Sequence, residues 1–279
     1  SGGVDSSVVA ALLVEQGYDV TGAYMINYDD APVTPPSLPL KRGGECWRED
    51  YNDAIRVAAK LGIPLLKLDF RQEYKSQVLD YMYKEYEAGR TPNPDVMCNK
   101  FIKFGAWLDK IKELGFDKMA TGHYASLSQK SIKSKVHKVN LMCAKDSNKD
   151  QTYFLHQLNQ NQLSHTLFPL GKYTKDEVRE LAKKFDLPTA NKEESMGICF
   201  VGEVSMKEFL ENKIKDKIKG GDIVLSNGEK IGKHDGLAFY TIGQRQLRVQ
   251  SRKSKVESGD NKPLYVVEKN FKKNELIVG

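Results

Sequence analysis

Residues 1–17 read SGGVDSSVVAALLVEQG and carry the strongest indication of the fold. Its apolar residues recur at helical spacing up to Gly17, so we predict a helix over 4–14. Two glycines and three serines lie at the start of that helix. Backbone N–H groups at a helix start lie at the positive end of the helix dipole and bind phosphate. The stretch therefore predicts a phosphate-binding loop, with a buried strand expected ahead of Ser1.

Further segments alternate between strand and helix patterns. We predict strands at 20–26, 65–70 and 118–121, and helices at 49–61, 74–88, 102–114 and 174–185. Thr174 and Glu177 have the spacing of a capping box at the start of the last helix. Strands that alternate with helices indicate a parallel sheet with helices on both faces, so the fold class is α/β.

The sequence pattern changes after Phe209, where short strand patterns are separated by glycine and Asn-Gly turns. We predict an ATP-binding catalytic domain at 1–203, a small β-rich domain at 204–267, and the start of a truncated C-terminal barrel at 268–279. The whole net charge of +6 falls in 204–279. Such a basic appendage suits a polyanion such as RNA, although a solvated lysine face explains it equally well.

Composition excludes some classes of protein. No apolar run approaches the roughly 20 residues that cross a bilayer. The cysteines, Cys46, Cys98, Cys143 and Cys199, form no CxxC pair and are too few for a disulfide framework in 279 residues. We therefore expect a reducing compartment, the cytoplasm, or the mitochondrion if a transit peptide precedes Ser1. Cys46 is interpreted as a structural residue and Cys143 as a small buried one.

Two cysteines stand in segments that suggest chemistry. In PNPDVMCNK, residues 92–100, Asp95 and Cys98 share a face if the turn after Pro94 is helical, and a cysteine at a helix start has more thiolate character. Cys199 lies in GICF, between glycine and apolar residues. One such cysteine is usually a buried structural residue. Two of them beside a phosphate loop indicate sulfur chemistry.

These motifs resemble a known family. SGGxDS lacks the lysine of GxxxxGK[ST] and is similar to the PP-loop of the N-type ATP pyrophosphatases, which cleave ATP between its α and β phosphates. SGGVDSS, PNPDVMCNK, ATGHYA, KDQTYFL, MGICFVGE, GKHDG and YTIGQR follow the order and rough spacing of the tRNA-specific 2-thiouridylases. That family thiolates the wobble uridine in the anticodon stem-loop of tRNA. The basic stretch 246–262 departs from the family, which usually has glycine-rich sequence there.

The resemblance implies a reaction and a set of residues. ATP with Mg²⁺ would adenylate the 2-oxygen of the uridine, and sulfur would then replace that oxygen. Cys199 would carry the sulfur as a persulfide, Cys98 would act as nucleophile, and Asp95 as acid or base. The implied ATP-binding residues are Ser1, Gly2, Gly3, Val4, Asp5, Ser6, Met25 and Gly122. Those implied to contact the target base or tRNA are Asn93, Pro94, Asp95, His123, Lys149, Asp150 and Gln151.

The resemblance also implies partners: tRNA, and a sulfur-relay protein or cysteine desulfurase as sulfur donor. No tightly bound metal is expected. An iron–sulfur cluster on Cys98, Cys199 and a third ligand is a minority alternative, because no third clustered cysteine is present.

Two other functions compete with this reading. The first is a PP-loop ligase that adenylates a small carboxylate or ureido substrate, for which the cysteines would be incidental. The second is a catalytically silent RNA-binding module that keeps the loop as a relic. Retention of Cys98, Cys199 and Asp95 favours the thiouridylase over both.

Overall fold

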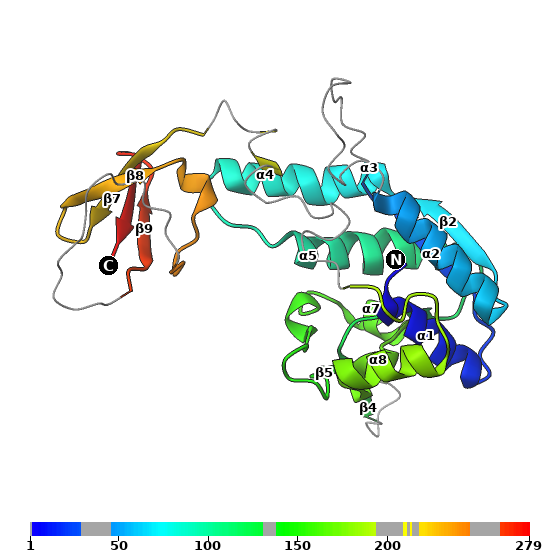
Figure 1. Ribbon diagram of the computed structural model, residues 1–279. Coiled ribbons are helices and arrows are strands. Elements are labelled where there is room, and N and C mark those ends of the chain that lie inside the picture. Colours follow the sequence, from blue (N-terminus) through cyan, green and yellow to red (C-terminus); the bar gives the residue numbers. More distant parts are fainter. Residues whose placement is uncertain are drawn as a thin grey trace, which may run out of the picture. The chain divides into compact units, whose positions relative to one another are not determined.

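The computed structural model describes residues 2–28, 46–130, 138–193, 209, 210, 213, 218–245 and 263–279 (Figure 1). The chain forms two compact units. The first joins Ser1–Val78 to Pro94–Val204, and the second joins Leu79–Asn93 to Ser205–Gly279. The division predicted at 203 and 267 stays a proposal, and the grouping of Leu79–Asn93 with the C-terminal residues had no signal in the sequence.

The first unit begins with a β/α arrangement. Helix α1 (Val4–Glu15) is followed by strand β1 (Gly22–Ile26), helix α2 (Cys46–Leu61) and strand β2 (Leu65–Asp69). The two strands pair in parallel, from Gly22 opposite Leu65 to Ile26 opposite Asp69. The ring of Tyr24 in β1 packs against that of Tyr51 in α2, with centroids 5.1 Å apart. The alternating pattern therefore gave the correct element types, and the parallel pairing of an α/β fold is confirmed.

Helices continue beyond the bounds that periodicity indicated. The predicted helix at 74–88 starts earlier, as α3 (Arg71–Tyr74), a π-helical turn (Lys75–Leu79) and α4 (Asp80–Glu87), which belongs to the second unit. The helix predicted at 102–114 starts as α5 (Pro94–Met97), widens into a π-helix (Cys98–Ala106) and ends as α6 (Trp107–Glu113). The Gln162 side chain donates to the carbonyls of Lys100, at 3.4 Å, and Phe104, at 2.7 Å.

The rest of the first unit adds two further strand pairs. Strands β3 (Met119–Ala120) and β6 (Thr166–Leu167) are parallel, and β4 (Ser126–Lys130) and β5 (Lys138–Met142) form an antiparallel hairpin that no sequence prediction contained. Two 3₁₀ turns (Thr152–Phe154 and Pro169–Lys172) and two helices, α7 (Gln160–Ser164) and α8 (Lys175–Lys184), complete this part. The capping box of Thr174 and Glu177 at the start of α8 is confirmed.

Two apolar clusters hold these elements together. Val8 and Leu12 of α1 are buried with Val178 and Ala182 of α8, and the two helices lie side by side in Figure 1. The second cluster gathers side chains of the π-helix, α6, β3, β5 and α7, including Phe104. Each fully buried aliphatic or aromatic side chain contributes about 1.5–3 kcal/mol to folding. The first cluster thus fixes α1, and with it the glycine loop at its start.

The second unit contains one four-stranded sheet, in the order β8-β7-β10-β9. Its strands are β7 (Gly221–Leu225), β8 (Lys230–His234), β9 (Val266–Asn270) and β10 (Glu275–Val278). Beside them lies a 3₁₀ turn (Leu237–Phe239), and their core includes Ile223 and Leu276, both fully buried. The small β-rich domain is confirmed, although the boundary predicted at 267 falls inside β9. The basic stretch 246–262 lies outside the described residues.

No helix in the described part of the chain is long and apolar enough to cross a membrane.

Candidate functional site

The predicted phosphate loop has the backbone geometry of a helix start. Gly2 has φ +67°, a left-handed conformation that favours glycine, and Gly3 is the extended N-cap of α1. The Gly3 carbonyl accepts the Ser7 N–H at 3.2 Å and the hydroxyls of Ser6 at 3.1 Å and Ser7 at 2.7 Å. Gly3 has no side chain to cap the helix, so the first-turn N–H groups face the site where an anion would bind.

Gly122 lies against this loop. A Cβ atom added to Gly122 would come within 3.0 Å of the Asp5 Cβ and 3.1 Å of the Ser6 nitrogen. The loop after β3 and the start of α1 are therefore in backbone contact. Two segments implied to hold ATP, more than a hundred residues apart in sequence, meet here.

Asp5 is held by two donors on one oxygen. The Tyr124 hydroxyl donates to Asp5 Oδ1 at 3.1 Å, and Lys175 Nζ lies 2.7 Å from the same oxygen. Gln151 is paired with the Tyr124 backbone: Gln151 Oε1 accepts the Tyr124 N–H at 3.0 Å, and the Gln151 N–H donates to the Tyr124 carbonyl at 2.9 Å. The ATGHYA and KDQTYFL motifs are thus joined to the phosphate loop through one tyrosine.

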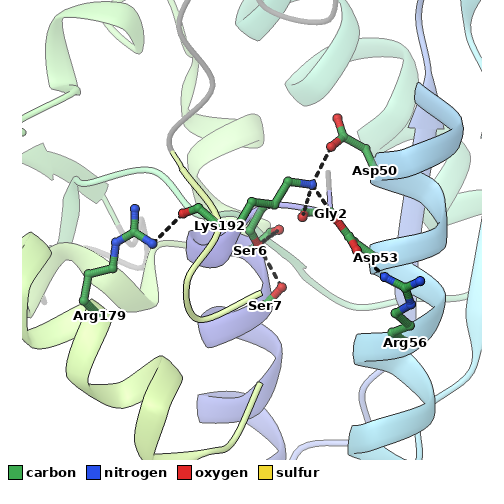
Figure 2. A network of polar contacts seen from close by, with 9 residues as sticks. Gly2, Ser6, Ser7, Asp50, Asp53, Arg56, Arg179 and Lys192 are labelled. Carbon is green, nitrogen blue, oxygen red and sulfur yellow. Dashed lines mark hydrogen bonds and ion pairs between the residues drawn. The ribbon is translucent and has the colours of Figure 1, made fainter. Parts of the chain in front are cut away.

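Lys192 also contacts the phosphate loop (Figure 2). Its Nζ lies 3.1 Å from the Gly2 carbonyl oxygen, 2.6 Å from Asp50 Oδ1 and 2.6 Å from Asp53 Oδ2, both on α2. Burial lowers the pKa of Lys192, but the hydrogen bonds and charges of the two aspartates outweigh burial, so its pKa lies above the ordinary value. Lys192 therefore carries a positive charge at neutral pH.

Two arginines contact other members of this network, one an aspartate and the other the backbone around Lys192. Arg56 Nη1 lies 3.2 Å from Asp53 Oδ1, and Arg179 of α8 donates to the carbonyls of Ala190 at 3.1 Å and Lys192 at 2.6 Å. Figure 2 shows the Lys192 side chain directed towards Gly2 and α2, with Arg179 on the opposite side, next to the Lys192 carbonyl. The segment that carries Lys192 is therefore anchored to α8.

Cys98 lies inside the protein. The turn after Pro94 is helical, so Asp95 and Cys98 lie three residues apart on one helical run. Cys98 has no exposed surface, whereas Cys143, which the sequence predicted to be buried, is exposed, so that prediction is wrong. The next residue, Asn99, is buried and donates to the Phe154 carbonyl at 3.3 Å. Its Oδ1 has no hydrogen-bond partner among the described residues. This contact brings PNPDVMCNK next to KDQTYFL.

His123 lies in an aromatic environment. Its ring stands 5.7 Å from the ring of Phe104 and 6.1 Å from that of Phe168, and its Nδ1 is 2.9 Å from Thr121 Oγ1. The residue as a whole is only partly buried, but desolvation of its imidazole, with the charge of Lys103 as the smaller cause, holds the pKa of His123 well below its ordinary value of 6.5. His123 is neutral at pH 7.

The KDQ segment is a well-bonded turn. Asp150 Oδ1 accepts the Ala144 N–H at 2.8 Å, and Oδ2 accepts the Thr152 hydroxyl at 2.5 Å. The Lys149 N–H donates to Asp146 Oδ1 at 3.2 Å. The Asp150 side chain shapes the turn, while Gln151 connects it to Tyr124.

Comparisons with known proteins match this organisation. A family model described as the tRNA methyl transferase HUP domain matches residues 1–203, and one described as the tRNA methyl transferase PRC-barrel domain matches 207–279. Curated proteins named tRNA-specific 2-thiouridylase are 49% identical in Listeria monocytogenes and Staphylococcus carnosus and 48% identical in Levilactobacillus brevis. Each alignment covers 100% of this chain and 69–70% of the relative.

The chain belongs to the tRNA-specific 2-thiouridylase family. The predicted resemblance is therefore confirmed over the full length of the chain. The three relatives are bacterial, so the comparisons give no support to the mitochondrial alternative.

Of the remaining residues implied by the 2-thiouridylase resemblance, some lie in the described part of the chain and others do not. Met25 lies buried in β1, opposite Leu68 of β2. Asn93 immediately precedes α5 in sequence and groups with the second unit. Ser1 and Cys199 lie outside the described residues.

Reasoning from the sequence missed several residues beside the 2-thiouridylase loop. Tyr124 stood within a quoted motif without a role, and Lys175 directly follows the Thr174 cap. Lys192 and its two aspartates had no local signal, because their contacts join segments about 140 residues apart in sequence. Only the pairing of distant segments in the fold reveals them.

Proposed function

We propose that this chain catalyses the ATP-dependent 2-thiolation of the wobble uridine in the anticodon of tRNA. The observation that carries the proposal is the convergence of Gly122, Tyr124 and Gln151 on the start of α1, in a chain 49% identical to curated 2-thiouridylases. The β-rich domain and the basic excess of 204–279 suit a polyanionic partner such as tRNA. As a tRNA-modifying enzyme with bacterial relatives, it is expected in the cytoplasm.

The first step activates the base. The N–H groups at the start of α1 and the glycines of the loop bind the phosphates of ATP, with Gly122 leaving room beside them and Met25 contacting the adenosine. The uridine 2-oxygen attacks the α phosphorus, pyrophosphate leaves, and C2 then bears an adenylate. AMP is a far better leaving group than the original carbonyl oxygen.

The second step transfers sulfur. The terminal sulfur of a Cys199 persulfide attacks C2, and AMP leaves with the former 2-oxygen. The Cys98 thiolate then attacks Cys199 Sγ. The bond between Cys199 Sγ and the transferred sulfur breaks, and its electrons remain on the sulfur of the new 2-thiouridine. A Cys98–Cys199 disulfide forms, which an external thiol reduces. Asp95, on the same helical run as Cys98, would act as the acid or base of the reaction.

The target base must leave its stack to reach this site. Asn93, Pro94 and Asp95 would line its pocket, and His123, Lys149, Asp150 and Gln151 would contact the RNA. His123 is neutral, so it would act as a hydrogen-bonding or stacking group rather than as a cation. A sulfur-relay protein or cysteine desulfurase would deliver the persulfide.

Mg²⁺ enters as part of the MgATP substrate, whose phosphates and waters supply most of its ligands. Asp5, in the loop itself, would supply a single protein ligand to this ion, and the contacts that Tyr124 and Lys175 make with its Oδ1 orient its carboxylate. The described residues contain no group of three or more His, Cys, Asp and Glu side chains arranged to hold a metal ion.

The descriptions of the matching family models include methyl transfer. Methyl transfer needs neither cleavage of ATP at the α phosphate nor a cysteine that carries sulfur. The SGGVDSS loop and the cysteine in PNPDVMCNK therefore favour thiolation. They also favour it over a ligase acting on a small carboxylate, for which Cys98 would have no function.

The proposal is tested by incubating the protein with ATP, Mg²⁺, a persulfide donor and unmodified tRNA, followed by mass spectrometry of 2-thiouridine. Cys98→Ala and Cys199→Ala should each abolish product. Cys143→Ala, at an exposed free cysteine, is the matched control and should retain activity. Thiolation at the wild-type rate by either of the first two variants would rule out the two-cysteine mechanism.

A further inference from the structure

Lys192 makes a contact that ordinary surface ion pairs do not make. Besides the carboxylates of Asp50 and Asp53, its Nζ donates to the Gly2 carbonyl, a backbone atom of the phosphate loop. The side chains of the three charged residues are 28%, 31% and 20% exposed, so water competes with these contacts less than on an open surface.

This contact sets the direction of one peptide plane. In a trans peptide the carbonyl of Gly2 and the N–H of Gly3 point in opposite directions. When the carbonyl is directed at Lys192, the Gly3 N–H is directed away from it. The Gly3 carbonyl is already engaged by Ser6 and Ser7 in the first turn of α1.

A peptide between two glycines has little intrinsic preference for one orientation. Glycine tolerates positive and negative φ about equally, so the Gly2–Gly3 peptide can flip at low cost unless a neighbour holds it. A flip would replace an N–H donor by a carbonyl oxygen, which repels phosphate. A fixed donor on the Gly2 carbonyl therefore decides whether the loop presents a binding or a repelling group.

We propose that Lys192 is a positioning residue for ATP, which fixes the Gly2–Gly3 peptide so that the Gly3 N–H faces the nucleotide phosphates. Asp50 and Asp53 hold the ammonium group in place on the side of α2. Lys192 thus serves the nucleotide through the backbone, in a loop that lacks the phosphate-binding lysine of the common P-loop. This inference rests on the proposed function, because it assumes that the loop binds ATP.

The chain offers a matched control at the other end of the same helix. Lys184 Nζ lies 3.3 Å from Glu15 Oε1, at the last residue of α1, and both side chains are more than half exposed. That ion pair also joins α1 to a distant segment, but it makes no described contact with the phosphate loop. A general loss of anchoring of α1 would appear in both variants, whereas a loop effect would appear only at Lys192.

The test measures binding of a non-hydrolysable ATP analogue with Mg²⁺ by equilibrium dialysis, together with the thermal midpoint. Lys192→Met should weaken analogue binding about tenfold, the scale expected for loss of one charge-assisted hydrogen bond to the loop. Lys184→Met should bind as the wild type does. Equal binding by Lys192→Met and the wild type would overturn the inference. Absence of binding by the wild type would instead overturn the proposed function.

A triple variant separates positioning of the carbonyl from neutralisation of the aspartates. In Lys192→Met/Asp50→Ala/Asp53→Ala no unpaired carboxylate remains to repel phosphate, yet the Gly2 carbonyl still lacks its donor. We expect this variant to keep the tenfold defect. Recovery of wild-type binding would show that the lysine only neutralises charge. If Lys192→Met does not fold because its carboxylates are left unpaired, the triple variant carries the test alone.

Discussion

Replacing Gly2 by alanine should damage the phosphate loop more than its backbone angle alone would suggest. Gly2 has φ +67°, and an alanine forced into that conformation lowers the free energy of unfolding by about 1–2 kcal/mol. Part of this loss is offset because alanine reduces the conformational entropy of the unfolded chain. A Cβ at Gly2 would also fall on the backbone carbonyl of Asp50 in α2. Making room for a methyl group in such packing costs about 1–3 kcal/mol. We therefore expect a total loss of about 2–4 kcal/mol.

Gly17, at the other end of α1, separates the two contributions. It has φ +80°, and no described atom lies within 4 Å of a Cβ built there. Gly17→Ala should therefore cost only the backbone term, about 1 kcal/mol.

The assay is urea unfolding of both variants together with the KM for ATP. In Gly2→Ala the loop must move away from Asp50 to relieve the clash, and this displaces the groups that bind phosphate. The KM for ATP should therefore rise about tenfold, which corresponds to about 1.4 kcal/mol. The KM of Gly17→Ala should not change. The reasoning is refuted if the two variants lose equal stability and bind ATP equally well.

Three further outcomes follow from the described contacts. Iodoacetamide should label the exposed Cys143 in the native protein and reach Cys98 only after unfolding, as read by peptide mass spectrometry; rapid native labelling of Cys98 would contradict its burial. Thr174→Ala removes the hydroxyl that caps α8 and should lower the free energy of unfolding by about 1 kcal/mol in urea titrations, whereas an unchanged value would deny the cap a role. Because the pKa of His123 is lowered in the folded state, the unfolded state takes up the proton first as the pH falls. The free energy of unfolding should therefore decrease below pH 6.5, by at most about 1.4 kcal/mol per pH unit. His123→Gln should remove this contribution, and an unchanged pH profile in the variant would assign the dependence to other groups.

Local patterns were sufficient for much of the fold. The apolar spacing before Gly17 identified α1, and the Thr174–Glu177 spacing identified the start of α8, because both depend on residues within one or two turns. The phosphate loop was recognised for the same reason. Its chemistry depends on consecutive backbone N–H groups and on glycines that the sequence states directly.

The rest of the site depends on contacts between distant segments. The hairpin of β4 and β5 has no Asn-Gly turn in its connecting sequence, and its pairing shows only in the fold. The π-helical start at Cys98 was missed because its widened turn is supported by Gln162, a residue on another helix. Lys192 likewise has meaning only when α2 and the loop are brought together.

The central claim is that ATP activates the 2-oxygen of a tRNA uridine so that sulfur can replace it. An anticodon stem-loop carrying ¹⁸O at uridine C2 tests this directly, with the products AMP, pyrophosphate and RNA separated and weighed by mass spectrometry. We expect the ¹⁸O in the phosphate of AMP, in an amount equal to the 2-thiouridine formed. Formation of 2-thiouridine with unlabelled AMP, or release of AMP while the ¹⁸O stays in the RNA, would contradict the claim.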